Sequence, residues 1–203
     1  MLQRSNGAVE VDVCFTLDGV PVLTHNFEPD GELAFPDGKP TVKQFLETKI
    51  NGRWTPLTFA MFVELVRGWT GIVFVDAKRG EMVRLAEWLE TSPIKDVVDQ
   101  WVFQIGSEAE FLACKRVGLE VLHFNAPLPE AYRWIPWMKA HGVHTISIPH
   151  RSILSATTLQ PFRDAGLHVF AWTVNHQTDR QRVLQAGAKG YFTDWLLERR
   201  DER

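Results

Sequence analysis

The sequence predicts an α/β fold in which parallel strands are covered by helices. Short runs rich in valine, isoleucine and phenylalanine alternate along the 203 residues with longer runs of amphipathic, helical spacing. Several helical runs end at a glycine, as helices that lead into a strand often do. No glycine-rich dinucleotide fingerprint follows any strand, which disfavours an open doubly wound sheet and favours a (β/α)8-type barrel.

The predicted strands are short apolar runs bounded by turn residues: 8–15, 71–78, 98–105, 119–124, 144–149, 167–174 and 190–194. The predicted helices lie between and after them: 55–68, 107–118, 128–142, 156–166, 179–190 and 195–203. Thr55-Pro56 is a typical helix start, and Ser107 and Glu110 have the spacing of a capping box. The strands number seven, whereas a complete barrel has eight and usually about 250 residues.

Residues 16–55 interrupt this alternation. Thr16 to Gly19 has the composition of a hairpin turn, and the run that follows, Val20 to His25, is typical of a returning strand. A loop rich in proline, glycine and charge comes next. We expect a small insertion here, between the first strand and its helix. No low-complexity linker divides the chain, so residues 1–203 are expected to form a single domain.

Composition excludes several classes of partner. The chain is 45% apolar and 23% charged, as soluble globular proteins are. A formal net charge of −3 and a pI near 6.2 give no basic footprint for nucleic acid. No apolar run is long enough for stable membrane insertion. The two cysteines are too few for a disulfide framework, which favours the reducing cytoplasm. No signal peptide is visible, although one would precede Met1 if the sequence starts within a longer chain, which leaves export open.

Polar residues gather at the ends of the predicted strands, where a parallel barrel carries its active site. Residues two apart on a strand share a face, so each of the pairs Glu10/Asp12 and Asp76/Lys78 points to one side. The remaining candidates lie at other strand ends or in the hairpin loop: Gln104, Trp172, Asn175 and His25.

These residue types suit phosphate-ester chemistry. Three carboxylates, Glu10, Asp12 and Asp76, are ligands for a hard divalent cation such as Ca²⁺ or Mg²⁺, which would offset their repulsion. Lys78 would add a positive charge for an anionic substrate, and His25 could transfer a proton.

Each of these candidates also has an ordinary structural reading. The acids could form a solvated strand edge, and Asp76 and Lys78 a structural ion pair. His25 could be an ordinary loop residue, Gln104 could cap a loop, and Trp172 could pack in the core. Asn175 could belong to a turn.

Three segments in this order resemble the glycerophosphodiester phosphodiesterase family. GAVEVDVCFTLDGVPVLTHN is similar to the region from the family's Glu-x-Asp metal pair to a catalytic histidine, with His25 thirteen residues after Asp12. GIVFVDAK resembles the strand that ends in an acid-x-Lys motif, and HVFAWTVNHQTDRQRVLQAGAKGYFTD resembles the C-terminal signature.

The resemblance implies a TIM barrel with an insertion at residues 16–55 and one divalent cation on Glu10, Asp12 and Asp76. It implies His25 as an acid–base residue, Lys78 as a cation beside the phosphate, and Trp172 as a pocket wall. Gln104 and Asn175 are expected to contact the substrate. The implied reaction converts a glycerophosphodiester, a small molecule, to glycerol 3-phosphate and an alcohol.

The sequence departs from the family pattern at four places. In the C-terminal signature, Trp195-Leu196 follow Thr193-Asp194 where the family often has Thr-Asp-x-Pro. The third acid is Asp76 where glutamate is usual, and an Asp-x-Lys motif also fits a phospholipase D-like lyase that forms a cyclic phosphate. Asn26 follows His25 where the family often has aspartate. The family's first strand, with His-Arg-Gly, would precede Met1.

The absence of that strand leads to three further expectations. We expect a barrel that lacks its first βα unit, impaired hydrolysis, and self-association through open strand edges. A non-catalytic remnant that binds a metal ion or phosphate is the other reading.

Overall fold

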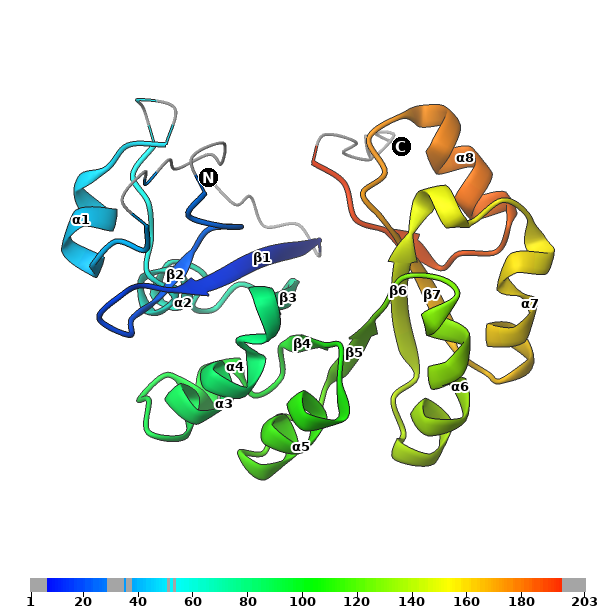
Figure 1. Ribbon diagram of the computed structural model, residues 1–203, viewed down its shortest axis with the longest axis horizontal. Coiled ribbons are helices and arrows are strands. Elements are labelled where there is room, and N and C mark those ends of the chain that lie inside the picture. Colours follow the sequence, from blue (N-terminus) through cyan, green and yellow to red (C-terminus); the bar gives the residue numbers. More distant parts are fainter. Residues whose placement is uncertain (1–6, 29–34, 36–37, 51, 53, 195–203) are drawn as a thin grey trace. The chain divides into compact units, whose positions relative to one another are not determined.

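The structure, a computed structural model, has an α/β fold, as predicted, and describes residues 7–28, 35, 38–50, 52 and 54–194 (Figure 1). Its chain forms two compact units, residues 1–122 and 123–203. That the two units make up a single domain stays a prediction. The helix predicted over 195–203 lies outside the described residues. None of the helices in the described ranges is both long and apolar enough to cross a bilayer.

The first unit contains a mixed sheet whose strands lie in the order β2-β1-β3-β4. The strands are β1 (Ala8–Phe15), β2 (Pro21–Leu23), β3 (Ile72–Ala77) and β4 (Val102–Ile105). β1 is parallel to β3, and β3 is parallel to β4. β2 returns antiparallel beside β1, which confirms the predicted hairpin.

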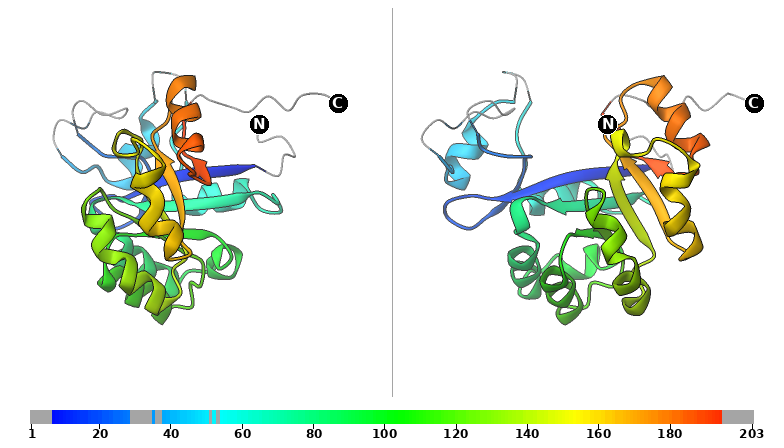
Figure 2. Two further views of the ribbon diagram at one scale, coloured as in Figure 1. Left: turned by 90° about the vertical axis from the view of Figure 1, so that its right-hand side faces the viewer. Right: turned by 45° about the vertical axis from the view of Figure 1, so that its right-hand side comes forward.

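The helices of this unit are α1 (Val42–Glu47), α2 (Phe59–Leu65), α3 (Met82–Glu90), α4 (Lys95–Val98) and α5 (Glu108–Arg116), with a 3-10 turn η1 (Lys78–Gly80). β2 and α1 lie between β1 and α2, as the predicted insertion requires. α3 and α5 pack side by side (Figure 2). The predicted N-cap Ser107 accepts a hydrogen bond from the Glu110 N–H.

Some predicted boundaries are wrong. The helix predicted to start at Thr55-Pro56 is α2, which begins only after Thr58, because the Thr58 hydroxyl accepts a hydrogen bond from the Met61 N–H. The strand predicted over 98–105 begins only at Val102, since the preceding residues form α4 and a turn. Trp101 closes that turn by donating its N–H to Val98 and packs its ring on Phe59 and Phe62.

The second unit is a parallel sheet in the order β5-β6-β7-β8. Its strands are β5 (Leu122–Asn125), which starts at the unit boundary, β6 (Thr145–Pro149), β7 (His168–Trp172) and β8 (Gly190–Tyr191). Its helices are α6 (Glu130–His141), α7 (Ala156–Asp164) and α8 (Gln177–Gln185), with a 3-10 turn η2 (His150–Ser152). α6 ends at Gly142, whose φ of 70° explains the glycine.

His123 is fully buried in the core of the second unit. Its Nδ1 lies 2.9 Å from the Thr145 hydroxyl, and its ring meets Phe170 and Phe192 edge to face. Burial lowers the pKa of His123 to about 3 from its usual 6.5. The folded chain therefore keeps this imidazole neutral under conditions in which the unfolded chain protonates it.

Between pH 6.5 and pH 3 the unfolded chain binds a proton at His123 that the folded chain does not. The free energy of unfolding should therefore fall as the pH drops through this window, with His123 contributing about 2 kcal/mol between pH 7 and pH 5. Urea denaturation of wild type and His123→Asn at both pH values measures this contribution. An equal pH dependence in the two proteins would contradict the assignment.

Candidate metal centre

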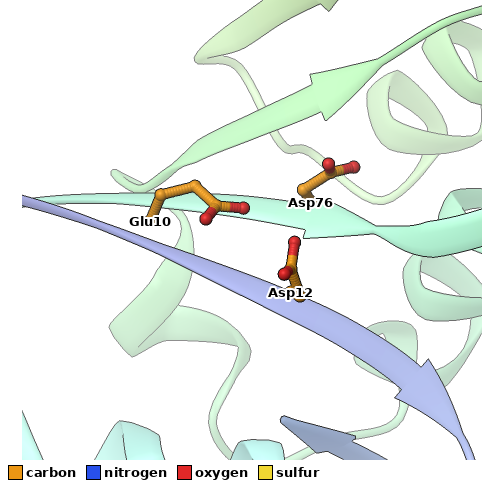
Figure 3. A group of neighbouring side chains, drawn as sticks. All are labelled: Glu10, Asp12 and Asp76. Atoms are coloured by element: carbon orange, nitrogen blue, oxygen red, sulfur yellow. The ribbon is translucent and has the colours of Figure 1, made fainter. Parts of the chain in front are cut away.

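Three carboxylates come together on two neighbouring parallel strands of the first unit. Glu10 and Asp12 project from β1 and Asp76 from β3, and the strand register sets Asp12 opposite Asp76. One oxygen of each group lies within 4.8 Å of the others. Figure 3 shows the three side chains near one another on the two paired strands. The predicted acidic group is thus formed by adjacent strands.

The alternation of the strands produces this arrangement. On β1 the opposite face carries Val11 and Val13, which are buried, so the acids must occupy the other face. On β3, Val73 and Val75 are buried in the same way and leave Asp76 on the face of the acids. Burial of the valines therefore fixes the side of the sheet on which the acids stand.

Lys78 is the cation of the cluster. Its Nζ donates a hydrogen bond to Asp76 Oδ2 at 2.5 Å and forms an ion pair with Asp12 Oδ1 at 2.6 Å. Burial lowers the pKa of Lys78, but the two carboxylates outweigh burial and hold that pKa above its usual range. Lys78 is therefore charged and bridges the two strands through their acids.

Glu10 is the acid whose negative charge the cluster does not compensate. Its pKa is raised to about 9, above all by burial. The negative charge of Asp12, the hydrogen bond between Glu10 and Asp12, and the charge of Asp76 also raise the pKa, whereas the positive charge of Lys78 lowers it. One lysine thus does not compensate three acids, and Glu10 keeps its proton near neutral pH. A divalent cation would supply the missing positive charge, and oxygen ligands suit a hard ion, so these residues fit one.

His25 lies on an exposed loop that is tied to the strand of the acids. The Thr24 N–H donates to the Asp12 carbonyl at 3.1 Å, and Cys14 Sγ donates to the His25 carbonyl at 3.5 Å. Cys14 is itself buried among Val22, Phe27 and Phe45 of the insertion. The loop that bears His25 therefore starts directly beside Asp12.

Glu81 anchors the far end of β1. One carboxylate oxygen accepts the Phe15 N–H at 2.9 Å, and the other accepts from Lys39 of the insertion at 2.8 Å. The guanidinium of Arg84 lies 4.2 Å from the centre of the Phe15 ring. Sequence patterns do not point to Glu81, because its contact with Phe15 joins residues 66 positions apart.

The other predicted residues lie in both units. Gln104 is buried on β4, and the register that pairs Phe74 with Val102 sets it level with Asp76. In the second unit, Trp172 Nε1 donates to Asn125 Oδ1 at 3.1 Å. Asn125 was not predicted, although it too ends a strand.

Asn175 joins two loops of the second unit. Its Nδ2 donates to Asp194 Oδ2 at 2.7 Å, and its Oδ1 accepts from the Asp194 N–H and the Thr193 hydroxyl. This is the loop chemistry that the sequence leaves open for Asn175, and the residue's contact with a substrate stays a prediction.

The protein is thus an α/β protein in which two neighbouring parallel strands bring three acids and a lysine together. The profile of the glycerophosphoryl diester phosphodiesterase family matches residues 72–197, more than half of the chain. The chain belongs to this family of hydrolases. The matched range contains Asp76 and Lys78, whereas Glu10, Asp12 and His25 precede it.

Solved structures of the same family share the fold. A phosphodiesterase from Oleispira antarctica in complex with the product sn-glycerol-3-phosphate is 18% identical, with a TM-score of 0.72 over 95% of this chain and 83% of that one. A glycerophosphodiester phosphodiesterase from Parabacteroides distasonis is 15% identical, with a TM-score of 0.72 over 94% and 80%. One from Agrobacterium tumefaciens is 16% identical, with a TM-score of 0.68 over 95% and 86%. These likenesses confirm the predicted barrel-type fold class. A search of curated proteins gave no match.

The raised pKa of Glu10 means that, without a bound cation, an ionised Glu10 lowers the free energy of unfolding. Between pH 4.5 and pH 9 the folded chain holds a proton that the unfolded chain releases, so stability falls as the pH rises through this window. At pH 8 without metal, Glu10→Gln should raise the free energy of unfolding by about 1 kcal/mol or more.

The same variant should lose the increase in Tm that Ca²⁺ or Mg²⁺ gives wild type. Calorimetry with chelator and with each cation measures both effects. Glu90→Gln, which removes an exposed acid at the end of α3, is the matched control. An undiminished cation response in Glu10→Gln would refute Glu10 as a ligand.

Proposed function

We propose that this chain hydrolyses glycerophosphodiesters to glycerol 3-phosphate and an alcohol, with one divalent cation, Ca²⁺ or Mg²⁺, held by Glu10, Asp12 and Asp76. The observation that carries the proposal is the convergence of these acids and Lys78 on paired strands of a chain that belongs to the family. The product bound to the Oleispira antarctica phosphodiesterase supports the choice of substrate class.

A bound cation would stabilise negative charge on the phosphate oxygens. Lys78 is charged and lies between Asp12 and Asp76, so it can hold a phosphate oxygen beside the acids. His25, on the loop that begins next to Asp12, is the candidate for acid–base chemistry. We assign substrate contacts to Gln104, Trp172 and Asn175, with the Trp172 indole as an apolar wall.

Turnover by the 203-residue chain is expected to be weak. Its sequence contains no His-Arg-Gly, the motif that the family resemblance places on another catalytic strand. Loss of one acid or base typically lowers a rate by about 10²–10⁴-fold. Cytoplasmic location and self-association through strand edges stay predictions.

A lyase reaction is the second candidate, and the Asp76-x-Lys78 motif favours it. In that reaction a hydroxyl of the substrate attacks the phosphorus, the bond to the leaving alcohol breaks, and a cyclic phosphate forms. The products separate the two candidates, because hydrolysis consumes water and releases glycerol 3-phosphate. A ³¹P NMR spectrum of the reaction mixture distinguishes the cyclic from the open phosphate.

We expect slow, cation-dependent release of glycerol 3-phosphate from a glycerophosphodiester, measured by an enzyme-coupled assay with chelator and with added Ca²⁺ or Mg²⁺. Asp12→Asn should abolish this release, since it removes a ligand and a partner of Lys78. Asp99→Asn, at an exposed acid next to α4, is the matched control and should keep the wild-type rate.

Two results would contradict the proposal. One is a wild-type rate in Asp12→Asn, and the other is no product of either kind from wild type at any cation concentration. A cyclic phosphate as the sole product would replace hydrolysis by the lyase reaction.

A further inference from the structure

We propose that Asn26 is a positioning residue that holds the His25 imidazole in the tautomer with its proton on Nε2. In this form His25 donates a hydrogen bond at Nε2 and has no lone pair there with which to act as a base. The inference rests on the proposed function for the catalytic importance of His25, but the tautomer itself follows from hydrogen bonds within residues 24–28.

The first step is the orientation of the Asn26 amide. The backbone N–H of Glu28 donates a hydrogen bond to Asn26 Oδ1 at 3.1 Å. A backbone N–H can only donate, so the atom that faces it must be the amide oxygen and not the nitrogen. The oxygen end of the Asn26 side chain is therefore directed at Glu28, and the nitrogen end points the other way.

The second step is the ring nitrogen that this amide nitrogen meets. Asn26 Nδ2 lies 3.2 Å from His25 Nδ1. The NH₂ group of an amide donates and does not accept, so Nδ1 must offer a lone pair. A neutral imidazole with an unprotonated Nδ1 carries its hydrogen on Nε2.

The third step is that the backbone around the pair is held in place. The Thr24 hydroxyl donates to the Asn26 carbonyl at 2.8 Å, and the Thr24 N–H donates to the Asp12 carbonyl at 3.1 Å. Cys14 Sγ, buried in the insertion's apolar cluster, donates to the His25 carbonyl. The backbone that carries the His25 and Asn26 side chains is thus anchored to the strand that carries Glu10 and Asp12.

This tautomer decides what His25 can do in the proposed reaction. A hydrogen on Nε2 can bond to an oxygen of the phosphate or of the leaving alcohol. General-base catalysis at Nε2 needs the other tautomer, with the hydrogen on Nδ1. A carboxylate at position 26 would accept that Nδ1 hydrogen, as the aspartate of a catalytic triad does, while its other oxygen still accepts the Glu28 N–H.

Asn26→Asp is therefore expected to switch the tautomer without removing the turn. Two-dimensional ¹H–¹⁵N NMR of the full chain, above the pH at which its histidines titrate, distinguishes a protonated from an unprotonated ring nitrogen. The His25 signals are identified by their loss in His25→Gln. We expect an unprotonated Nδ1 in wild type, a protonated Nδ1 in Asn26→Asp, and a mixture of both tautomers in Asn26→Ala.

Hydrolysis provides the second readout. Asn26→Asp should release glycerol 3-phosphate about 10-fold or more faster than wild type, part of the about 10²–10⁴-fold that a positioned base contributes. Asn26→Ala should show no such gain. Equal Tm values for the three proteins would exclude a difference in folding as the cause.

The outcomes separate this inference from the proposed function. A protonated Nδ1 in wild type, or no change of tautomer in Asn26→Asp, would overturn the inference whatever the activity. A switched tautomer with an unchanged rate would overturn its catalytic consequence. If no variant releases product but the tautomers are as expected, the proposed function fails and the role of Asn26 in setting the tautomer stands.

Discussion

The parallel pairing of β1 with β3 is the constraint on which the candidate site depends. Its register sets Asp12 opposite Asp76 and brings Glu10 close to both, so that like charges share one face of the sheet. Such a face is unfavourable unless something compensates it. Lys78 compensates part of the charge from within the chain, and the proton on Glu10 marks the part that remains. This imbalance is the physical basis of the proposed cation site.

Hydrogen bonds hold the neighbouring loops against β1, the strand that carries Glu10 and Asp12. Glu81 binds the Phe15 N–H and Lys39, while Thr24 binds the Asp12 carbonyl. The insertion is therefore positioned by hydrogen bonds at the end of β1 and by the apolar cluster around Cys14. The position of the loop that bears His25 is in this way coupled to the strand that carries Glu10 and Asp12.

Family membership and local geometry support different parts of the proposal. The family profile covers the strand with Asp76 and Lys78, but Glu10, Asp12 and His25 precede the matched range. The sheet register connects the two parts of the candidate site, because it makes Asp12, which precedes the matched range, the direct neighbour of Asp76, which lies within it. The family thus supports the kind of reaction, and the structure shows that the acids proposed as metal ligands lie close together.

The sequence by itself determined the α/β class, most strands, the hairpin and the common face of Glu10 and Asp12, because a repeat of two or of 3.6 residues is a local property. Only the tertiary structure decided that Lys78 bridges Asp12 and Asp76 and that Glu81 holds β1. It also moved the start of β4, where the packing of Trp101 on Phe59 and Phe62 outweighed local preference. The physical reason is that these contacts depend on side-chain packing and on hydrogen bonds whose partners no local pattern specifies.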